Sequence, residues 1–217
     1  MIREVVYLDF LDALLQGDKS RCGLIVQNVL SQGADIRDIY INIFQKSMYR
    51  IGKLWEQNNL SIAQEHMATQ IIDCLVSTAF MNLPHRTRCS HKAVITCIDK
   101  EFHQIGAKMV SNIFELNGWC SYFMGSNTPG REVLEVIAER KPDIVGISFS
   151  FYMNYLRFLE SLDNIRSNFP DQAIIVGGQG LTLELTTLLN KDYPQVTYFK
   201  SINELDEYLQ AKSAVAS

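Results

Sequence analysis

The sequence predicts an α/β protein in which an N-terminal four-helix bundle precedes a flavodoxin-like, doubly wound sheet of five parallel strands. Two observations support this fold. Up to about residue 80, apolar residues recur at helical spacing, whereas beyond residue 92 short β-rich runs alternate with amphipathic segments. Between them, residues 83–91 show no periodicity. We therefore expect a bundle over 1–82, a linker over 83–91 and an α/β domain over 92–217.

The first two helices are expected over residues 2–16 and 19–31. Each is followed by a glycine, Gly17 and Gly33, and glycine commonly takes the left-handed conformation that ends a helix. The short turns that remain between them favour antiparallel neighbours, as in a bundle.

Two further helices come next, one starting at Asp35 and one capped by Ser61. Asn58 and Asn59 interrupt the pattern between them, and Gln64 stands three positions after Ser61, as in a capping box. Their expected apolar stripes are Ile36, Tyr40, Phe44, Met48, Ile51 and Trp55 in the third helix, and Ala63, Met67, Ile71, Leu75 and Ala79 in the fourth.

The second half alternates strands and helices, which predicts a parallel sheet with helices on both faces. Ligands of such sheets bind at the carboxyl ends of the strands. The expected strands are 93–98, 119–124, 143–149, 173–176 and 196–199, and the expected helices are about 104–117, 130–140, 153–168, 180–190 and 202–212.

Composition narrows the functional classes. The net charge is -4 and no run of Lys and Arg is present, so direct nucleic-acid binding is not expected. No apolar run is long enough to cross a membrane. The five cysteines form no Cys-x-x-Cys pair, which favours free thiols in a reducing cytoplasm and argues against a zinc or iron–sulfur site.

The loop after the first strand of the sheet carries a candidate metal ligand, His103. Glu101, two residues earlier, can accept a hydrogen bond from one imidazole nitrogen, which fixes the tautomer and directs the other nitrogen to a metal. Asp99 is a second candidate for that role. Gly106 lets another group approach the backbone closely. Taken alone, a histidine in such a loop is more often an ordinary surface residue.

Two more strand ends meet the same edge of the sheet. Ser148 and Ser150 end the third strand, and Gly177 and Gly178 end the fourth, where missing side chains would open a slot. Singly, such serines and glycines are usually turn chemistry. Their spacing is more specific, because 41 residues separate Gly106 from Ser148 and 26 separate Ser150 from Gly177.

In this combination the second half resembles the cobalamin-binding fold of methionine synthase, methylmalonyl-CoA mutase and corrinoid proteins. That family has the pattern Asp-x-His-x-x-Gly, then Ser-x-Leu, then Gly-Gly. Here Glu101 replaces the aspartate, which keeps the carboxylate but adds a methylene, and Ser150 replaces the leucine, which makes the pocket wall more polar.

The resemblance implies that cobalamin is the cofactor. His103 would be the lower cobalt ligand in place of the cofactor's own base. The displaced nucleotide tail would lie beside Gly177 and Gly178, and Ser148 would hydrogen-bond its base. Neutral imidazole is a good ligand for a first-row transition metal.

The first half carries a second motif, in which Trp55 is followed after nine residues by Glu65 and His66. Helix pattern alone favours a solvated helix edge with Trp55 in the core. The motif is, however, similar to the helical cap of cobalamin-dependent photoreceptors of the CarH type. This resemblance implies that Trp55 packs over the adenosyl group of adenosylcobalamin and that Glu65 hydrogen-bonds it. His66 would bind cobalt after light breaks the cobalt–carbon bond, giving a bis-histidine form.

The function expected from this resemblance is a light sensor, not an enzyme. CarH-type regulators carry an N-terminal DNA-binding domain that is not expected in this sequence, so the chain would be either an excised sensor module or a stand-alone sensor. A stand-alone sensor is expected to signal through a protein partner or through homo-oligomerisation. The alternatives are a corrinoid methyl carrier of a methyltransferase system and a light-independent cobalamin sensor. Methylcobalamin or hydroxocobalamin would then replace adenosylcobalamin. A radical mutase subunit is weakly supported, because no catalytic barrel is present.

Overall fold

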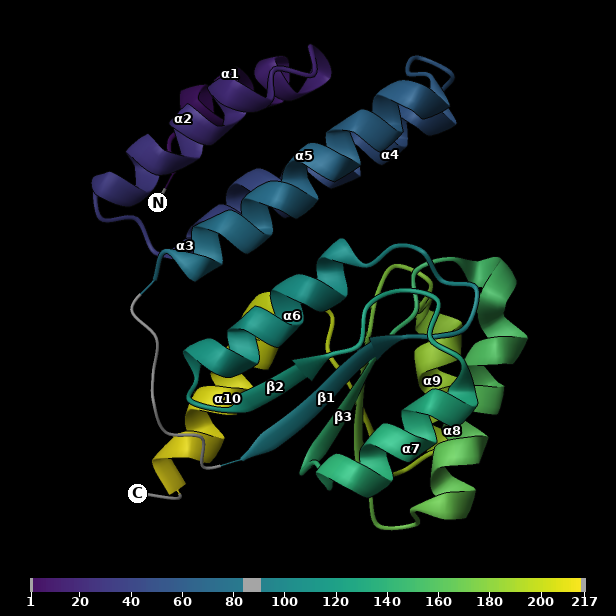
Figure 1. The fold of residues 1–217 in the computed structure, drawn as a ribbon. Coiled ribbons are helices and arrows are strands. Elements are labelled where there is room, and N and C mark those ends of the chain that lie inside the picture. Colours follow the sequence, from purple (N-terminus) through teal and green to yellow (C-terminus); the bar gives the residue numbers. More distant parts are fainter. Residues whose placement is uncertain (1, 84–90, 216–217) are drawn as a thin grey trace. The chain divides into compact units, whose positions relative to one another are not determined.

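The computed structural model describes residues 2–83 and 91–215, and the chain divides into two compact units, Met1–His85 and Arg86–Ser217. The expected linker falls largely on residues 84–90, which lie outside the described residues. The first unit is helical and the second contains the sheet (Figure 1).

The first unit is a bundle of helices. Helices α1 (Glu4–Leu15) and α2 (Lys19–Ser31) pack against each other and against α5 (Ile62–Met81), which also pairs with α4 (Lys46–Glu56). These bounds agree closely with the predicted helices. The apolar faces meet in a core whose fully or almost fully buried members include Phe10, Leu14, Val26, Tyr40, Phe44, Ile51, Ile72 and Val76.

The helix expected to begin at Asp35 contains a π-helical segment. Asp35 caps it by accepting a hydrogen bond from the backbone N–H of Arg37 at 2.8 Å. Helix α3 (Ile36–Ile39) then leads through η1 (Tyr40–Gln45) into α4. A π turn adds a residue to the turn and shifts the register of the helical turns after it, which a count of the apolar period does not detect.

Helix α5 confirms the capping box but corrects the predicted stripe. Ser61 Oγ accepts from Gln64 N–H at 3.2 Å, and Gln64 Oε1 accepts from Ser61 N–H at 3.0 Å. Of the predicted stripe, Ala63 and Met67 are exposed. Burial begins only at Ala68, because the bundle leaves the first turns of α5 uncovered. The buried residues are Ala68, Ile71, Ile72, Leu75, Val76 and Ala79.

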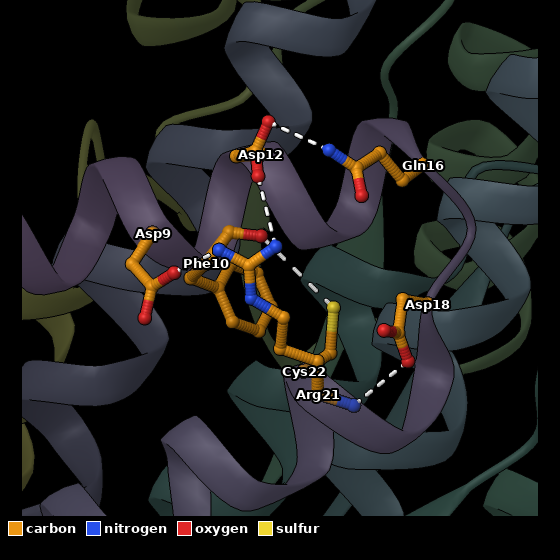
Figure 2. Close-up of polar contacts among 7 residues, drawn as sticks. All are labelled: Asp9, Phe10, Asp12, Gln16, Asp18, Arg21 and Cys22. Carbon is orange, nitrogen blue, oxygen red and sulfur yellow. Dashed lines mark hydrogen bonds and ion pairs between the residues drawn. The ribbon is translucent and has the colours of Figure 1, made fainter.

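Ion pairs link the first two helices at the surface. Figure 2 shows Arg21 of α2 between Asp9 and Asp12 of α1, with 2.9 Å from Arg21 Nη1 to Asp12 Oδ2. Asp18 caps α2 by accepting from the N–H of Arg21 at 2.9 Å. Because these side chains are exposed, the pairs orient the two helices more than they stabilise them.

The second unit contains a parallel sheet in the order β2-β1-β3-β4-β5. This is the flavodoxin-like order, and its switch point lies between β1 and β3. The register aligns the ends of the three central strands, because Cys97 pairs with Ser148 and Ser148 pairs with Gly177. The strands are β1 (Lys92–Cys97), β2 (Cys120–Phe123), β3 (Ile144–Ser148), β4 (Ala173–Gly177) and β5 (Val196–Tyr198).

Helices cover both faces of this sheet, as Figure 1 shows. One face carries α6 (Ile105–Leu116) and α10 (Ile202–Val215), which contact each other. The other carries α7 (Gly130–Arg140), α8 (Tyr155–Asn168) and α9 (Leu183–Asp192). A 3-10 turn, η2 (Tyr152–Asn154), precedes α8. The core on the second face is built on Phe149 and Phe158, whose rings stack with centroids 4.8 Å apart.

The cysteines only partly agree with the expectation of free thiols. Cys22, Cys74 and Cys97 are free, whereas Cys120 is disulfide-bonded. Among the described residues, no helix is long and apolar enough to cross a membrane.

Candidate cobalamin site

His103 lies near the end of the loop between β1 and α6, two residues before the helix begins, as the sequence predicts. Its side chain is 66% exposed. The loop leaves the central strand β1 at the switch point, so the imidazole stands at the edge of the sheet where ligands of this architecture bind.

Glu101 is the hydrogen-bond partner that orients this histidine. The residue is fully buried, and its Oε1 accepts hydrogen bonds from Nδ1 of His103 at 2.5 Å and from the N–H of His103 at 3.0 Å. Its Oε2 accepts from the N–H groups of Ser150 at 3.0 Å and Phe151 at 2.8 Å. One buried carboxylate therefore joins the histidine loop to the loop after β3.

Burial alone would raise the pKa of Glu101, because it disfavours the charged form, but the hydrogen bonds from His103, Phe151 and Ser150 outweigh it and lower the pKa below its usual range. An ionised Glu101 can accept a hydrogen bond from Nδ1–H of His103, and in that tautomer Nε2 carries the lone pair that a metal could use. Asp99, the alternative partner, instead pairs with Arg157 at 2.5 Å.

The two serines have different surroundings. Ser148 ends β3 between Cys97 and Gly177 and is partly exposed. Ser150 is attached to the site by its backbone, through Glu101. Burial raises the pKa of the Cys97 thiol to about 12, with a further rise from Glu101 and a partial offset from the Ser148 hydrogen bond. This thiol stays protonated.

The glycines after β4 are required by the fold. Gly178 has φ +120°, and a Cβ there would lie 2.1 Å from the carbonyl oxygen of Phe149. A Cβ at Gly180 would lie 2.7 Å from the Phe149 ring. The space beside Gly178 is therefore filled by the chain itself, and only Gly177, where a Cβ would meet nothing closer than 3.7 Å, keeps room on its side.

Gly106, in the first turn of α6, faces open space, because a Cβ there would meet no atom within 4 Å. No packing reason explains the glycine. It follows His103, whose imidazole is also exposed, by three residues. An open glycine close in sequence to an exposed histidine fits a large cofactor that lies against the backbone.

Exposed apolar side chains surround the histidine, and reasoning from the sequence did not identify them. Phe102 is 66% exposed and Phe151 is 51% exposed. The rings of Phe151 and His103 have centroids 6.3 Å apart. Single exposed apolar residues are common, but a contiguous group of them is typical of a binding surface. The sequence could have indicated this surface through the consecutive apolar residues that follow β3. The exposed stretch continues through Tyr152, Met153 and Leu156.

In the first unit, Glu65 and His66 form a second carboxylate–imidazole pair. His66 Nδ1 lies 2.5 Å from Glu65 Oε2, and the hydroxyl of Thr69 donates to Glu65 Oε1 at 2.7 Å. The His66 side chain is 73% exposed. Trp55 is 45% exposed, contrary to the core position that the stripe predicts. It lines a hollow of about 700 Å³ together with Ile62, at the junction of α4 and α5.

Comparison with known families identifies the cofactor of the chain. Two B12 binding domain models match the chain, one over residues 7–78 and one over residues 91–201, and the second alone spans more than half of it. The chain belongs to the B12-binding family. Cobalamin is thus its cofactor, and the two matches fall on the helical unit and on the sheet unit respectively.

Relatives of this B12-binding protein include a transcriptional repressor and corrinoid proteins. The HTH-type transcriptional repressor CarH of Myxococcus xanthus is 24% identical over 123 residues, which span 55% of this chain and 40% of the repressor. Trimethylamine corrinoid protein 1 of Methanosarcina acetivorans is 22% identical over 188 residues, which span 83% of this chain and 86% of that protein.

Among solved structures, a monomethylamine corrinoid protein of Methanosarcina barkeri has the same fold. The TM-score is 0.83 at 14% sequence identity, with 97% of this chain and 100% of that chain covered. The α/β fold with an N-terminal helical bundle is therefore confirmed along nearly the whole chain.

Proposed function

We propose that this B12-binding chain is a light sensor that holds adenosylcobalamin with His103 as the lower cobalt ligand. The observation that carries the proposal is the presence of two exposed histidines, His103 and His66, each with its Nδ1 2.5 Å from a carboxylate oxygen. In both, the carboxylate would fix the ring and leave Nε2 to the metal. A carrier that presents one open face to its partners has no use for the second pair.

On the lower side, His103 would bind cobalt and Glu101 would hold its ring. Gly106 would lie against the macrocycle, and Ser148 would hydrogen-bond the base of the nucleotide tail. The tail would pass Gly177, where a Cβ would find ordinary space. Ser150 and Gly178 would serve by shaping the loops, the first through its amide to Glu101 and the second through its contact with Phe149.

On the upper side, Trp55 and Glu65 would contact the adenosyl group. When bound, adenosylcobalamin would supply a light-sensitive cobalt–carbon bond, and His66 is the residue we propose to bind cobalt once that bond is broken. His66 suits a conditional role, because its ring is anchored by a neighbour on the same helix. We propose that the output is a change in a protein partner or in oligomeric state, without catalysis or direct nucleic-acid contact by this chain.

A methyl carrier is the second candidate. It is favoured by the match to a trimethylamine corrinoid protein over 86% of that protein's length, against 40% for the CarH repressor. In that case methylcobalamin would be the cofactor, and the partner would be a methyltransferase. The exposed aromatic side chain of Trp55, in the same unit as the potential metal ligand His66, argues against this use.

One experiment separates the two. The protein is loaded with adenosylcobalamin in the dark, and its visible spectrum and its size by chromatography are recorded before and after green light. A light sensor gives a stable bis-histidine spectrum with a change in size or shape, and His66→Ala abolishes the new spectrum while it leaves dark binding intact. The sensor proposal fails if light gives the same product in the wild type and in His66→Ala. If a methyltransferase moves the methyl group of bound methylcobalamin to a thiolate and leaves Co(I), while light gives neither a bis-histidine spectrum nor a change in size, the carrier is supported instead.

A further inference from the structure

The turn that precedes Glu101 is held in a conformation that its residue disfavours. Lys100 has φ +63°, in the left-handed region where a side chain with a Cβ is strained. Glycine adopts this conformation at little cost in free energy, whereas lysine adopts it only at a cost. Such strain persists only where the surrounding structure compensates for it, and it concentrates at functional sites.

Two asparagines compensate for it, one on each side of the same residue. Asn127 Oδ1 accepts a hydrogen bond from the N–H of Lys100 at 2.9 Å. Asn154 Nδ2 donates to the carbonyl oxygen of Lys100 at 3.0 Å. The N–H of Asn127 also donates to the carbonyl oxygen of Glu101 at 2.8 Å. The N–H and the carbonyl oxygen of Lys100 are thus both hydrogen-bonded by side chains from other parts of the chain.

These hydrogen bonds are connected through Glu101 to His103, the proposed metal ligand. Asn127 lies in the loop between β2 and α7, and Asn154 lies in η2 before α8. Between them they fix the peptide of Lys100 and Glu101, and the side chain of Glu101 then holds the imidazole of His103. A rotation of the turn would carry the Glu101 carboxylate away from its four donors.

We propose that Asn127 and Asn154 are positioning residues for the axial histidine, which set the geometry of cobalamin binding without contact with the metal. The inference rests on the proposed role of His103 as the lower ligand. It assigns opposite chemistry to two residues of the same type, because Asn127 must accept a hydrogen bond and Asn154 must donate one.

That opposition gives the test. Asn127→Asp keeps the acceptor and should behave as the wild type, whereas Asn154→Asp loses the donor and should fail. Asn127→Ala and Asn154→Ala should each lower the ratio of histidine-ligated to histidine-free cobalamin by about two- to tenfold, the range for one hydrogen bond. Asn168→Ala is the matched control, because Asn168 makes its bond to Asn164 within α8 and lies away from the loop.

The readout is the electron paramagnetic resonance spectrum of the reduced, Co(II) form, with nitrogen-15 histidine incorporated into the protein. Coupling to the labelled nitrogen reports histidine ligation, and coupling to ordinary nitrogen reports the cofactor's own base. If the wild type shows no labelled-nitrogen coupling, the ligand proposal itself fails. If the wild type shows it, and both aspartate variants match the wild type or both fail alike, the positioning proposal is overturned.

Discussion

Glu101 is predicted to stabilise the folded sheet unit, in addition to orienting the proposed metal ligand His103. Replacement by glutamine keeps the shape of the side chain but substitutes an NH₂ group for one carboxylate oxygen. Whichever way the amide points, one pair of donors, either on His103 or on Ser150 and Phe151, would face another donor. The variant is therefore a test of the hydrogen-bond network with little change in volume.

The size of the effect can be worked out from the number of bonds. A hydrogen bond to a charged group contributes about 1.5–3 kcal/mol, and a buried N–H left without a partner costs about 1–3 kcal/mol. The pair on Oε2 is only partly buried, so Glu101→Gln should lower the free energy of unfolding by about 2–5 kcal/mol. His103→Ala removes one of these hydrogen bonds and keeps the three backbone donors, so it should cost about 1.5 kcal/mol, the low end of the range for a bond to a charged group, because water can reach the exposed ring.

Urea unfolding of the protein without cofactor measures this difference. The chain has two tryptophans, Trp55 in the first unit and the buried Trp119 in the second. In a Trp55→Phe background, fluorescence therefore reports the sheet unit alone. Equal urea midpoints for the parent and Glu101→Gln would refute the reasoning, and a loss in His103→Ala as large as in Glu101→Gln would assign the stability to the ring instead.

The same variant should change the response to acid. Because the pKa of Glu101 is lowered in the folded protein, the unfolded state binds more protons on acidification. Its stabilising contribution is complete above the ordinary value of 4.5 and is lost as the pH falls through the folded-state pKa. In Glu101→Gln this contribution is absent, so the free energy of unfolding from urea titrations should fall less steeply than in the parent as the pH drops below 4.5.

Other predictions concern the glycines and the thiols. Gly178→Ala should destabilise the sheet unit by more than about 2 kcal/mol, because its Cβ would overlap the Phe149 carbonyl. Gly106→Ala should leave the free energy of unfolding unchanged or raise it by about 0.5–1 kcal/mol in thermal unfolding. The same variant should bind cobalamin more weakly in a titration. Cys97, whose pKa burial raises to about 12, should resist iodoacetamide at neutral pH and react after the more accessible Cys74, as peptide mass spectrometry would show.

The sequence was sufficient to predict the sheet and the edge of it at which these residues meet. Continuous apolar runs such as 143–149 are typical of buried strands between helices, and parallel strands bring their carboxyl ends to one edge. Ser148 and Gly177 therefore lie side by side, as their register shows. Glu101 and His103 are two residues apart, so their contact needed no knowledge of tertiary structure.

The features that could not be predicted depend on backbone groups and on non-local packing. The amides of Ser150 and Phe151 carry no side-chain signal, so their bonds to Glu101 were invisible in the sequence. The left-handed turn at Lys100 is occupied by a residue that gives no hint of it. The glycine at position 178 was interpreted as open space, whereas Phe149 fills that space.

The anchoring of the two histidines accounts for the different roles proposed for them. Glu101 is fully buried and bound to amides of another loop, so the ring of His103 is fixed to the sheet itself. The side chain of Glu65 is 22% exposed and is held by Thr69, one turn away on the same helix. His66 and its carboxylate can therefore change their surroundings together with α5, because the hydrogen bonds that join them to each other and to Thr69 all lie within that helix. The first arrangement suits the permanent ligand that we propose, and the second suits the ligand that we propose to bind only after light.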